Sequence, residues 1–276
     1  MSSTYRSIRR IFVAAALVAA ASLTGLAASA SDSTTDADHV KPTIVLVHGA
    51  FADASSWNGV TERLQRRGYN VLATANPLRG LTSDSAYLAS LLQQVPGPIV
   101  LVGHSYGGAV LTNAATHADN VVGLVYVAAF APAEGEVLSQ VEAGSTDSVL
   151  NSALVPFTYP SGGSTAVELI VDPAKFRDVF AADLSRKDAA LLAAGQRPAA
   201  ALAFNEPSGP PAWATLPSWA VVATGDKAAG ADIVRAQAKR AGATITEVRA
   251  SHVVLVSKPN VVADVIITAA RAVAEG

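Results

Sequence analysis

The chain has 276 residues, half of them hydrophobic, and contains no cysteine. That length suits one sizeable hydrophobic core, and the missing thiols exclude a disulfide framework and a thiolate metal site. The formal net charge is −2, with no dense run of Lys or Arg beyond the N-terminus, which argues against nucleic acid or a membrane surface as partner. We therefore expect a single domain that takes a small molecule and uses no metal; no feature predicts an oligomeric state.

The first 30 residues are typical of a secretory signal peptide. Three arginines precede an apolar run at 11–21, and Ala-Ser-Ala at 28–30 provides small residues for signal peptidase. The run is shorter than the roughly 20 residues that span a bilayer, so we expect cleavage after Ala30 and no membrane insertion afterwards. The arginine pair also resembles a twin-arginine signal, although Ile8 stands where Ser or Thr is usual. A secreted or cell-envelope location follows, by either export route.

Residues 31–41 are polar and lack apolar periodicity, which indicates a flexible lead-in to a domain at 42–276. Within that domain, short β-branched runs alternate with helical patterns, as in parallel sheets with crossover helices. The expected strands are 43–47, 70–75, 99–102, 122–128, 219–224 and 244–248. The expected helices are 57–67, 83–94, 106–117, 232–241 and 259–274. The pattern predicts an α/β fold with a mostly parallel central sheet.

The stretch 132–213 breaks this alternation. It contains Pro and Gly clusters around helical patterns near 173–180 and 186–194. We interpret it as a small helical cap inserted into the sheet. Because its side chains are largely apolar and carry few charges, the cap predicts an apolar pocket under a mobile lid.

A candidate nucleophile follows the strand at 99–102. The sequence Gly-His-Ser-Tyr-Gly-Gly at 103–108 leads directly into a helical pattern, which is the strand, sharp turn and helix of a nucleophile elbow. Gly103 and Gly107 leave room where a Cβ would collide with neighbouring backbone. Ser105 is thereby predicted to be the nucleophile.

A serine nucleophile needs a histidine within hydrogen-bond reach to take its proton. His39 lies in the lead-in and His117 at a helix end, whereas His48 and His104 sit in loop motifs where orienting the backbone is the expected role. His252 follows the last strand, in the chain order Ser, acid, His that this architecture uses. We therefore expect His252 to be the base.

The acid that orients this histidine should lie after a late strand. Asp226 follows the strand at 219–224 and is our first choice, although a Gly-Asp pair is also ordinary turn chemistry. Asp232 on the next helix and Glu134 after the strand at 122–128 are the alternatives.

A tetrahedral oxyanion needs two fixed backbone N–H donors. Tyr106, the residue after the nucleophile, is expected to supply one, and Ala50 in the loop after the first strand the other, with Phe51 as the alternative. Phe51 and Phe130 are also expected to line the substrate pocket, because both lie near the carboxyl ends of strands. Trp57 and Phe130 fit the pocket and simple packing of helices on the sheet equally well.

These motifs together resemble the α/β-hydrolase superfamily: His-Gly-Ala-Phe at 48–51, the elbow at 103–108, Asp226 and the Ser-His pair at 251–252. Within it, the chain is similar to a group of bacterial esterases, plant methylesterases and hydroxynitrile lyases. The resemblance implies cofactor-free chemistry on small esters or related carbonyl compounds. A Ser at position 105 argues against the dehalogenase and epoxide hydrolase branches, which need a carboxylate nucleophile.

The leading hypothesis is a secreted carboxylic ester hydrolase that forms an acyl-enzyme on Ser105. One alternative is a hydroxynitrile lyase, but those enzymes have a Lys next to the catalytic His, where this chain has Val253. The other is a non-catalytic small-molecule receptor on the same fold.

Overall fold

The computed structural model describes residues 41–275. The expected signal peptide at 1–30, and all of the lead-in except Lys41, lie outside these residues. Within residues 41–275, no helix combines the length and the apolar character needed to cross a membrane.

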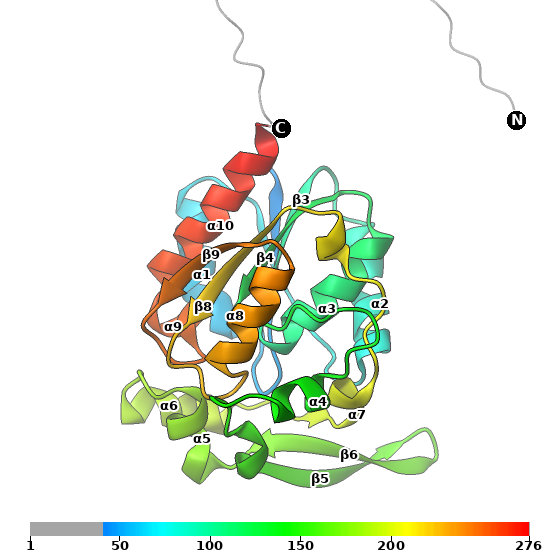
Figure 1. Cartoon of the computed structure of the whole chain (residues 1–276), viewed down its shortest axis with the longest axis vertical. Coiled ribbons are helices and arrows are strands. Elements are labelled where there is room, and N and C mark those ends of the chain that lie inside the picture. The colour runs from blue at the N-terminus through cyan, green and yellow to red at the C-terminus, as the bar shows by residue number, and fades with distance from the viewer. Residues whose placement is uncertain (1–40, 276) are drawn as a thin grey trace, which may run out of the picture. The chain divides into compact units, whose positions relative to one another are not determined.

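A six-stranded sheet forms the centre of the domain (Figure 1). Its strands are β1 (Thr43–Val47), β2 (Val71–Thr74), β3 (Ile99–His104), β4 (Val121–Val127), β8 (Ser218–Ala223) and β9 (Thr244–Val248). They run in the order β2-β1-β3-β4-β8-β9, and every neighbouring pair is parallel. All six match strands expected from the sequence, which confirms the predicted fold class. The central strands are almost entirely apolar, apart from His104 at the end of β3, because helices cover both of their faces.

Helices flank the sheet, and two pairs of them pack together. They are α1 (Asn58–Arg66), α2 (Leu81–Leu92), α3 (Tyr106–Ala114), α8 (Ala231–Arg240), α9 (Val254–Ser257) and α10 (Pro259–Ala274). Helix α1 packs against α10, and α2 packs against α3. Short 3-10 turns at Ala54–Trp57 and Ala115–His117 adjoin α1 and α3, which explains why the sequence patterns there looked longer than the α-helices.

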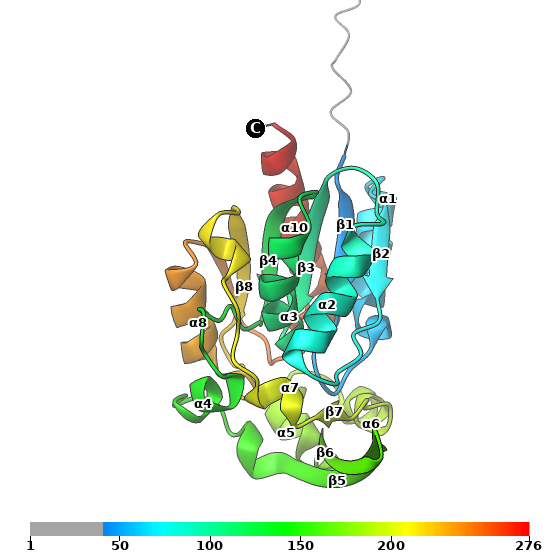
Figure 2. The ribbon, with the colours of Figure 1, turned by 90° about the vertical axis from the view of Figure 1, so that its right-hand side faces the viewer.

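A cap lies between β4 and β8 in the chain and covers the carboxyl end of the sheet (Figures 1 and 2). Its elements are α4 (Leu138–Ala143), β5 (Leu154–Ser161), β6 (Ser164–Val171), α5 (Pro173–Phe180), α6 (Arg186–Ala194), β7 (Ala199–Ala200) and α7 (Leu202–Asn205). Helices α5 and α6 have the bounds expected from the sequence. The cap therefore combines short helices with an antiparallel sheet of order β5-β6-β7.

The hairpin β5–β6 was not expected from the sequence, which showed only a Pro and Gly cluster there. Gly162 and Gly163 form its two-residue turn with φ values of 54° and 83°. Two positive φ values in a two-residue hairpin turn match the twist of the flanking strands, and glycine adopts them readily. Pro156 and Pro160 are tolerated because β5 is an edge strand.

One arginine joins the cap to the loop between β2 and α2. Arg79 Nη1 donates to Glu168 Oε2 on β6 at 2.9 Å, and its Nη2 donates to the carbonyl oxygen of Pro198 at 2.9 Å. Its guanidinium also lies over the ring of Tyr159, 4.9 Å from the ring centroid. A single residue of the sheet side thus contacts β5, β6 and the segment before β7.

Candidate active site

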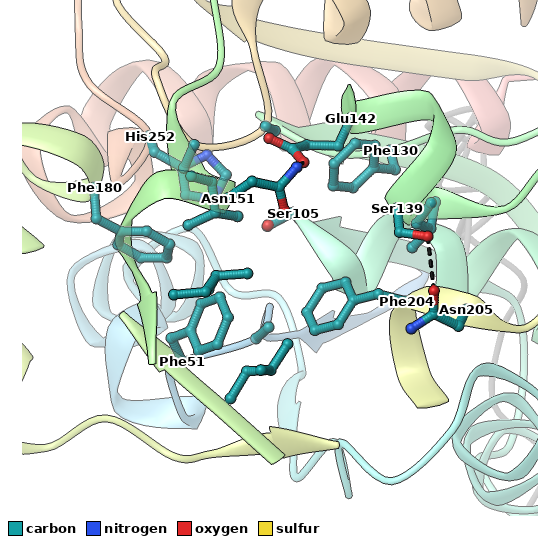
Figure 3. Close-up of a pocket in the computed structure, with 17 residues that line it drawn as sticks. Phe51, Ser105, Phe130, Ser139, Glu142, Asn151, Phe180, Phe204, Asn205 and His252 are labelled. Atoms are coloured by element: carbon teal, nitrogen blue, oxygen red, sulfur yellow. Dashed lines mark hydrogen bonds between the residues drawn. The ribbon is translucent and has the colours of Figure 1, made fainter. Parts of the chain in front are cut away.

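Every residue proposed for the site lies just beyond the carboxyl end of a parallel strand. Ser105 follows β3, Phe130 follows β4, Asp226 follows β8, His252 follows β9 and Ala50 follows β1. Parallel strands end at the same edge of the sheet, so these residues from distant parts of the chain converge. Figure 3 shows the pocket that four of them, Ala50, Ser105, Phe130 and His252, line together with the cap.

Ser105 has the backbone strain of a nucleophile elbow. Its φ is 54° and its ψ is −125°, a conformation that L-residues avoid unless the surrounding structure imposes it. The two expected glycines allow the turn: a Cβ on Gly103 would lie 2.6 Å from the Gly107 carbonyl oxygen, and one on Gly107 would lie 2.6 Å from the Val47 carbonyl oxygen. The Ser105 carbonyl oxygen accepts hydrogen bonds from the N–H groups of Gly108 and Phe130.

His252 and Asp226 form a buried pair. The Nδ1 atom of His252 donates to Asp226 Oδ2 at 2.8 Å, and both side chains are 1% exposed. The other carboxylate oxygen of Asp226 accepts from the N–H groups of Ala228 and Ala229 at 2.9 and 3.0 Å. With its proton on Nδ1, neutral His252 presents a lone pair at Nε2, which is the atom a general base uses.

The two alternative acids lie elsewhere. Asp232 accepts hydrogen bonds from Ser145 Oγ at 2.5 Å and from the N–H of Thr146 at 2.7 Å. Glu134 is exposed in a turn. Of the three candidate acids, only Asp226 is hydrogen-bonded to His252.

Ser105 and His252 line the same pocket. His252 Nε2 is buried, and no residue within 41–275 forms a hydrogen bond with it, Ser105 included. Such contacts are often long in substrate-free sites and shorten when substrate binds. The arrangement leaves the basic nitrogen available to the serine hydroxyl or to a substrate atom.

His48 holds the loop after β1. Its Nδ1 donates to the Gly49 carbonyl oxygen at 2.9 Å, and its Nε2 accepts from the N–H of Asn76 at 2.9 Å. The Asn76 side chain returns a hydrogen bond to the His48 carbonyl oxygen at 3.0 Å. Burial, the main influence, lowers the pKa of His48, in keeping with this neutral tautomer. The predicted role in orienting the backbone agrees with these contacts.

His104 contacts the histidine expected to be the base. Its Nε2 donates to the carbonyl oxygen of His252 at 3.0 Å, and the two rings lie 4.7 Å apart. Burial, and next the proximity of His252, holds the pKa of His104 well below its usual value. His104 therefore remains neutral and positions the loop that carries His252.

The expected oxyanion donors lie next to the nucleophile, one in the loop after β1 and one at the start of α3. Ala50 and Phe51 line the pocket, and Gly49 packs so closely that a Cβ there would lie 2.7 Å from the Ser105 Cβ. Tyr106 is the first residue of α3, so its N–H has no acceptor one turn earlier within the helix. These positions are compatible with donation from Ala50 and Tyr106 to one substrate oxygen.

The Tyr106 side chain points away from this chemistry. Its hydroxyl donates to Asp84 Oδ2 at 2.8 Å, and the Asp84 carboxylate also accepts from the N–H of Arg79 at 3.1 Å. Burial outweighs these hydrogen bonds and raises the pKa of Asp84. The contact ties the first residue of α3 to the loop that holds the cap.

The pocket encloses about 170 Å³, and its walls are mainly apolar, with four phenylalanine rings among leucine and alanine side chains. Phe51 stacks on Phe204 with ring centroids 6.0 Å apart, and Phe180 meets the His252 ring edge-on at 4.6 Å. Phe130 lies on the opposite side of Ser105 (Figure 3). Phe51 and Phe130 are thus where the sequence placed them, whereas Trp57 is fully buried against His104 and does not line the pocket.

Sequence reasoning missed four polar residues in this pocket, namely Ser139, Glu142, Asn151 and Asn205. Glu142 on α4 and Asn151 in the turn before β5 both line it and are hydrogen-bonded to each other. A single acid in a short helical pattern ordinarily indicates a solvated face, so the sequence held no signal for its burial. Within residues 41–275, no group of three His, Cys, Asp or Glu side chains is placed to hold a metal ion.

The parallel sheet, the strained serine between strand and helix and the buried histidine–aspartate pair define the class of protein. Residues 44–265 match the family model described as the alpha/beta hydrolase family. The chain belongs to that family, which confirms the resemblance inferred from its motifs.

Two curated relatives match part of the chain. A pyrethroid hydrolase from Sphingobium wenxiniae is 35% identical over 106 residues, which cover 33% of this chain and 37% of the relative. A carbendazim hydrolyzing esterase from a Nocardioides species is 33% identical over 107 residues, which cover 34% of this chain and 44% of that enzyme. The matched segments therefore span less than half the length of either relative.

The fold likeness extends further than these segments. A crystal structure of polyneuridine aldehyde esterase superposes with a TM-score of 0.70 at 21% identity, covering 83% of this chain and 98% of that one. At this identity the likeness establishes the shared fold.

Proposed function

We propose that the protein is a serine hydrolase that cleaves carboxylic esters of small, mainly apolar substrates through an acyl-enzyme. One observation carries the proposal: the His252–Asp226 pair leaves Nε2 of a buried imidazole in the pocket that also holds Ser105. The names of the two curated relatives, a hydrolase and an esterase, support ester hydrolysis.

In the first half-reaction, Ser105 Oγ attacks the ester carbonyl carbon while His252 Nε2 takes the hydroxyl proton. Asp226 keeps the imidazole in the required tautomer and stabilises the imidazolium that forms. The tetrahedral oxyanion receives hydrogen bonds from the N–H groups of Ala50 and Tyr106. The carbon–oxygen bond to the alcohol then breaks, and His252 returns the proton to the leaving alkoxide.

In the second half-reaction, water replaces the alcohol. His252 takes a proton from the water as its oxygen attacks the acyl carbon, and the same two N–H groups hold the second oxyanion. Collapse breaks the bond to Ser105 Oγ, which recovers its proton from His252 and releases the carboxylic acid.

The alternative activities gain no support from the pocket. Val253, Val254 and Leu255 follow His252, and no Lys or Arg is among the residues that line the pocket in the described part of the chain. A hydroxynitrile lyase of the kind considered above would need such a cation. A receptor would not need the His252–Asp226 pair beside a strained serine.

The proposal is tested by labelling. We expect a fluorophosphonate probe to modify Ser105, as seen by mass spectrometry of its peptide, and to abolish hydrolysis of p-nitrophenyl butyrate. Ser105→Ala should lose several powers of ten in turnover. Ser218→Ala is the matched control, because Ser218 is as buried as Ser105 (7% exposed). Ser218 is the first residue of β8 and so lies at the end of the sheet opposite to the pocket. Unchanged hydrolysis in Ser105→Ala would refute the mechanism.

We also propose that the enzyme is exported and acts outside the cytoplasm after removal of residues 1–30. The support is the sequence pattern alone. Intact-mass analysis of protein from the culture medium and cell envelope should find a chain that begins at Ser31. Replacing Arg9 and Arg10 by Lys should block export only if the twin-arginine route is used. A full-length chain confined to the cytoplasm would contradict the proposal.

A further inference from the structure

One carboxylate interrupts the apolar pocket. Glu142 is 8% exposed, and its side chain lines the cavity beside the aromatic residues. Its two oxygens accept hydrogen bonds from Ser148 Oγ and Asn151 Nδ2. Both donors are neutral, and within residues 41–275 no Lys, Arg or His lies within ion-pair distance of this carboxylate.

An ionised carboxylate that is removed from water without a cation is costly, and two neutral donors compensate it only in part. Burial outweighs those donors and raises the pKa of Glu142. The position is therefore electrostatically incomplete in the protein alone. A positively charged group brought by a ligand would complete it.

The rest of the pocket suits such a group. Asn151 uses its amide nitrogen on Glu142, which leaves its carbonyl oxygen as a further acceptor on the same wall. Phenyl rings attract cations to their faces, and four of them line this cavity. None of the lining residues in the described part of the chain is Lys or Arg, so no permanently charged cation of the protein opposes a ligand cation there.

We propose that Glu142 is a specificity-determining residue, and that the preferred substrates are esters carrying one cationic nitrogen, such as a protonated amine, on an otherwise apolar skeleton. The ester part of this statement rests on the proposed function; the cation site does not. The nitrogen binds between the carboxylate and the aromatic walls while the ester carbonyl lies at Ser105. Figure 3 shows Glu142, Asn151 and Ser105 around one cavity.

The competing explanation is that Glu142 only orders the chain after α4 through Ser148 and Asn151. Glu142→Gln removes the charge and retains the shape and one acceptor oxygen. Ser148→Ala is the matched control, because it removes the hydroxyl that Glu142 and the Ala228 carbonyl oxygen share and keeps the charge of Glu142.

The first test compares isosteric esters. 2-Dimethylaminoethyl butyrate and 3-methylbutyl butyrate differ in the charge on the alcohol side, and ethyl 4-dimethylaminobutyrate and ethyl 5-methylhexanoate differ on the acyl side. At about pH 8 the amines are protonated. In at least one pair, kcat/KM should favour the amine by about tenfold or more, and Glu142→Gln should abolish this preference while Ser148→Ala keeps it. Preference for both neutral esters, or an unchanged ratio in Glu142→Gln, would overturn the proposal.

The second test needs no turnover. N,N-Dimethylbenzylamine should bind the Ser105→Ala protein, measured by calorimetry, about tenfold or more tightly than the Ser105→Ala, Glu142→Gln protein. Equal binding to both proteins, or equally tight binding of neutral benzyl alcohol, would refute the cation site.

If the amine binds through Glu142 but no ester is hydrolysed, the proposed function fails and the cation site stands. If neutral esters are hydrolysed without any amine preference or Glu142 dependence, the cation site alone fails.

Discussion

The sheet edge and the cap enclose one pocket but build their halves differently. The sheet side holds Ser105, Asp226 and His252 through strained or hydrogen-bonded backbone, and all three are buried. The cap contributes side chains from short helices and a hairpin whose Phe157 remains 48% exposed. We propose from this comparison that the sheet side fixes the chemistry and the cap selects the substrate. Changes on the two sides should then alter different kinetic constants.

The largest effect is expected at the acid. Asp226→Asn should lower kcat by about 10⁴-fold, because an amide can donate to His252 Nδ1 and so favours the tautomer that carries its proton on Nε2. Steady-state kinetics on p-nitrophenyl butyrate measures the loss.

Asp232→Asn is the control for this variant. It changes the alternative acid, which accepts hydrogen bonds from Ser145 and Thr146 and not from His252. The variant should therefore keep kcat within about twofold of the wild-type value. If Asp232→Asn were the inactive variant, the assignment of the acid would be wrong.

A stability effect should follow at the elbow. Gly107→Ala would place a Cβ 2.6 Å from the Val47 carbonyl oxygen, where strand backbone has little room to move. We expect a loss of about 3 kcal/mol or more and a Tm lower by roughly 6–12 °C. Gly144→Ala in the cap, where the nearest atom is at 3.4 Å, should change Tm little. Similar Tm values for both variants would contradict the view that the backbone at the sheet edge is held more rigidly than the cap.

A smaller, kinetic effect is expected for the arginine that joins the halves. Arg79→Met should loosen the cap by removing the contacts to Glu168 and Pro198, raising KM by about threefold to tenfold with kcat nearly unchanged. The pair is partly exposed, so a double-mutant cycle with Glu168→Gln should give a coupling below about 1 kcal/mol. A drop in kcat at constant KM would show instead that Arg79 affects the chemical step and not the binding of substrate under the cap.

The smallest effect concerns acid stability where the two halves meet at Asp232. Burial alone would raise its pKa, but hydrogen bonds from Ser145 and Thr146 outweigh this and lower the pKa to about 2. Its ionised form therefore stabilises the fold above the unfolded-state pKa near 4, and this contribution is lost as the pH falls from about 4 through about 2. Denaturant unfolding should show wild type more stable than Asp232→Asn near neutral pH. This difference in the free energy of unfolding should disappear below about pH 2. A difference that grows as the pH falls would show that ionised Asp232 destabilises the fold.

The sequence predicted the sheet side far better than the cap, for physical reasons. Parallel strands buried on both faces leave runs such as Thr43–Val47, and the glycines of the elbow are dictated by backbone clashes that act locally. The hairpin β5–β6 contains two prolines, which resemble a loop unless one knows that β5 is an edge strand. Its Gly162-Gly163 turn was the one local signal for a hairpin, and it was interpreted as a break.

Glu142 shows a second limit of local patterns. Its helix is only six residues long, too short for a periodicity that separates a buried face from a solvated one. Its burial follows from the position of the cap over the sheet, which is a tertiary property. The expectation of an apolar pocket was therefore right for the walls and incomplete for this residue.

The hydrogen bond from His104 to the His252 carbonyl has a consequence for how this protein tolerates change. The cap separates Ser105 from His252 along the chain, and the bonded pair His104 and His252 are 148 positions apart in sequence. Yet His104, the residue before Ser105, is hydrogen-bonded directly to His252. We therefore expect insertions or deletions in the cap to change the length of chain between Ser105 and His252 without changing the distance between them, which would let the cap diversify while the proposed reacting pair stays in place.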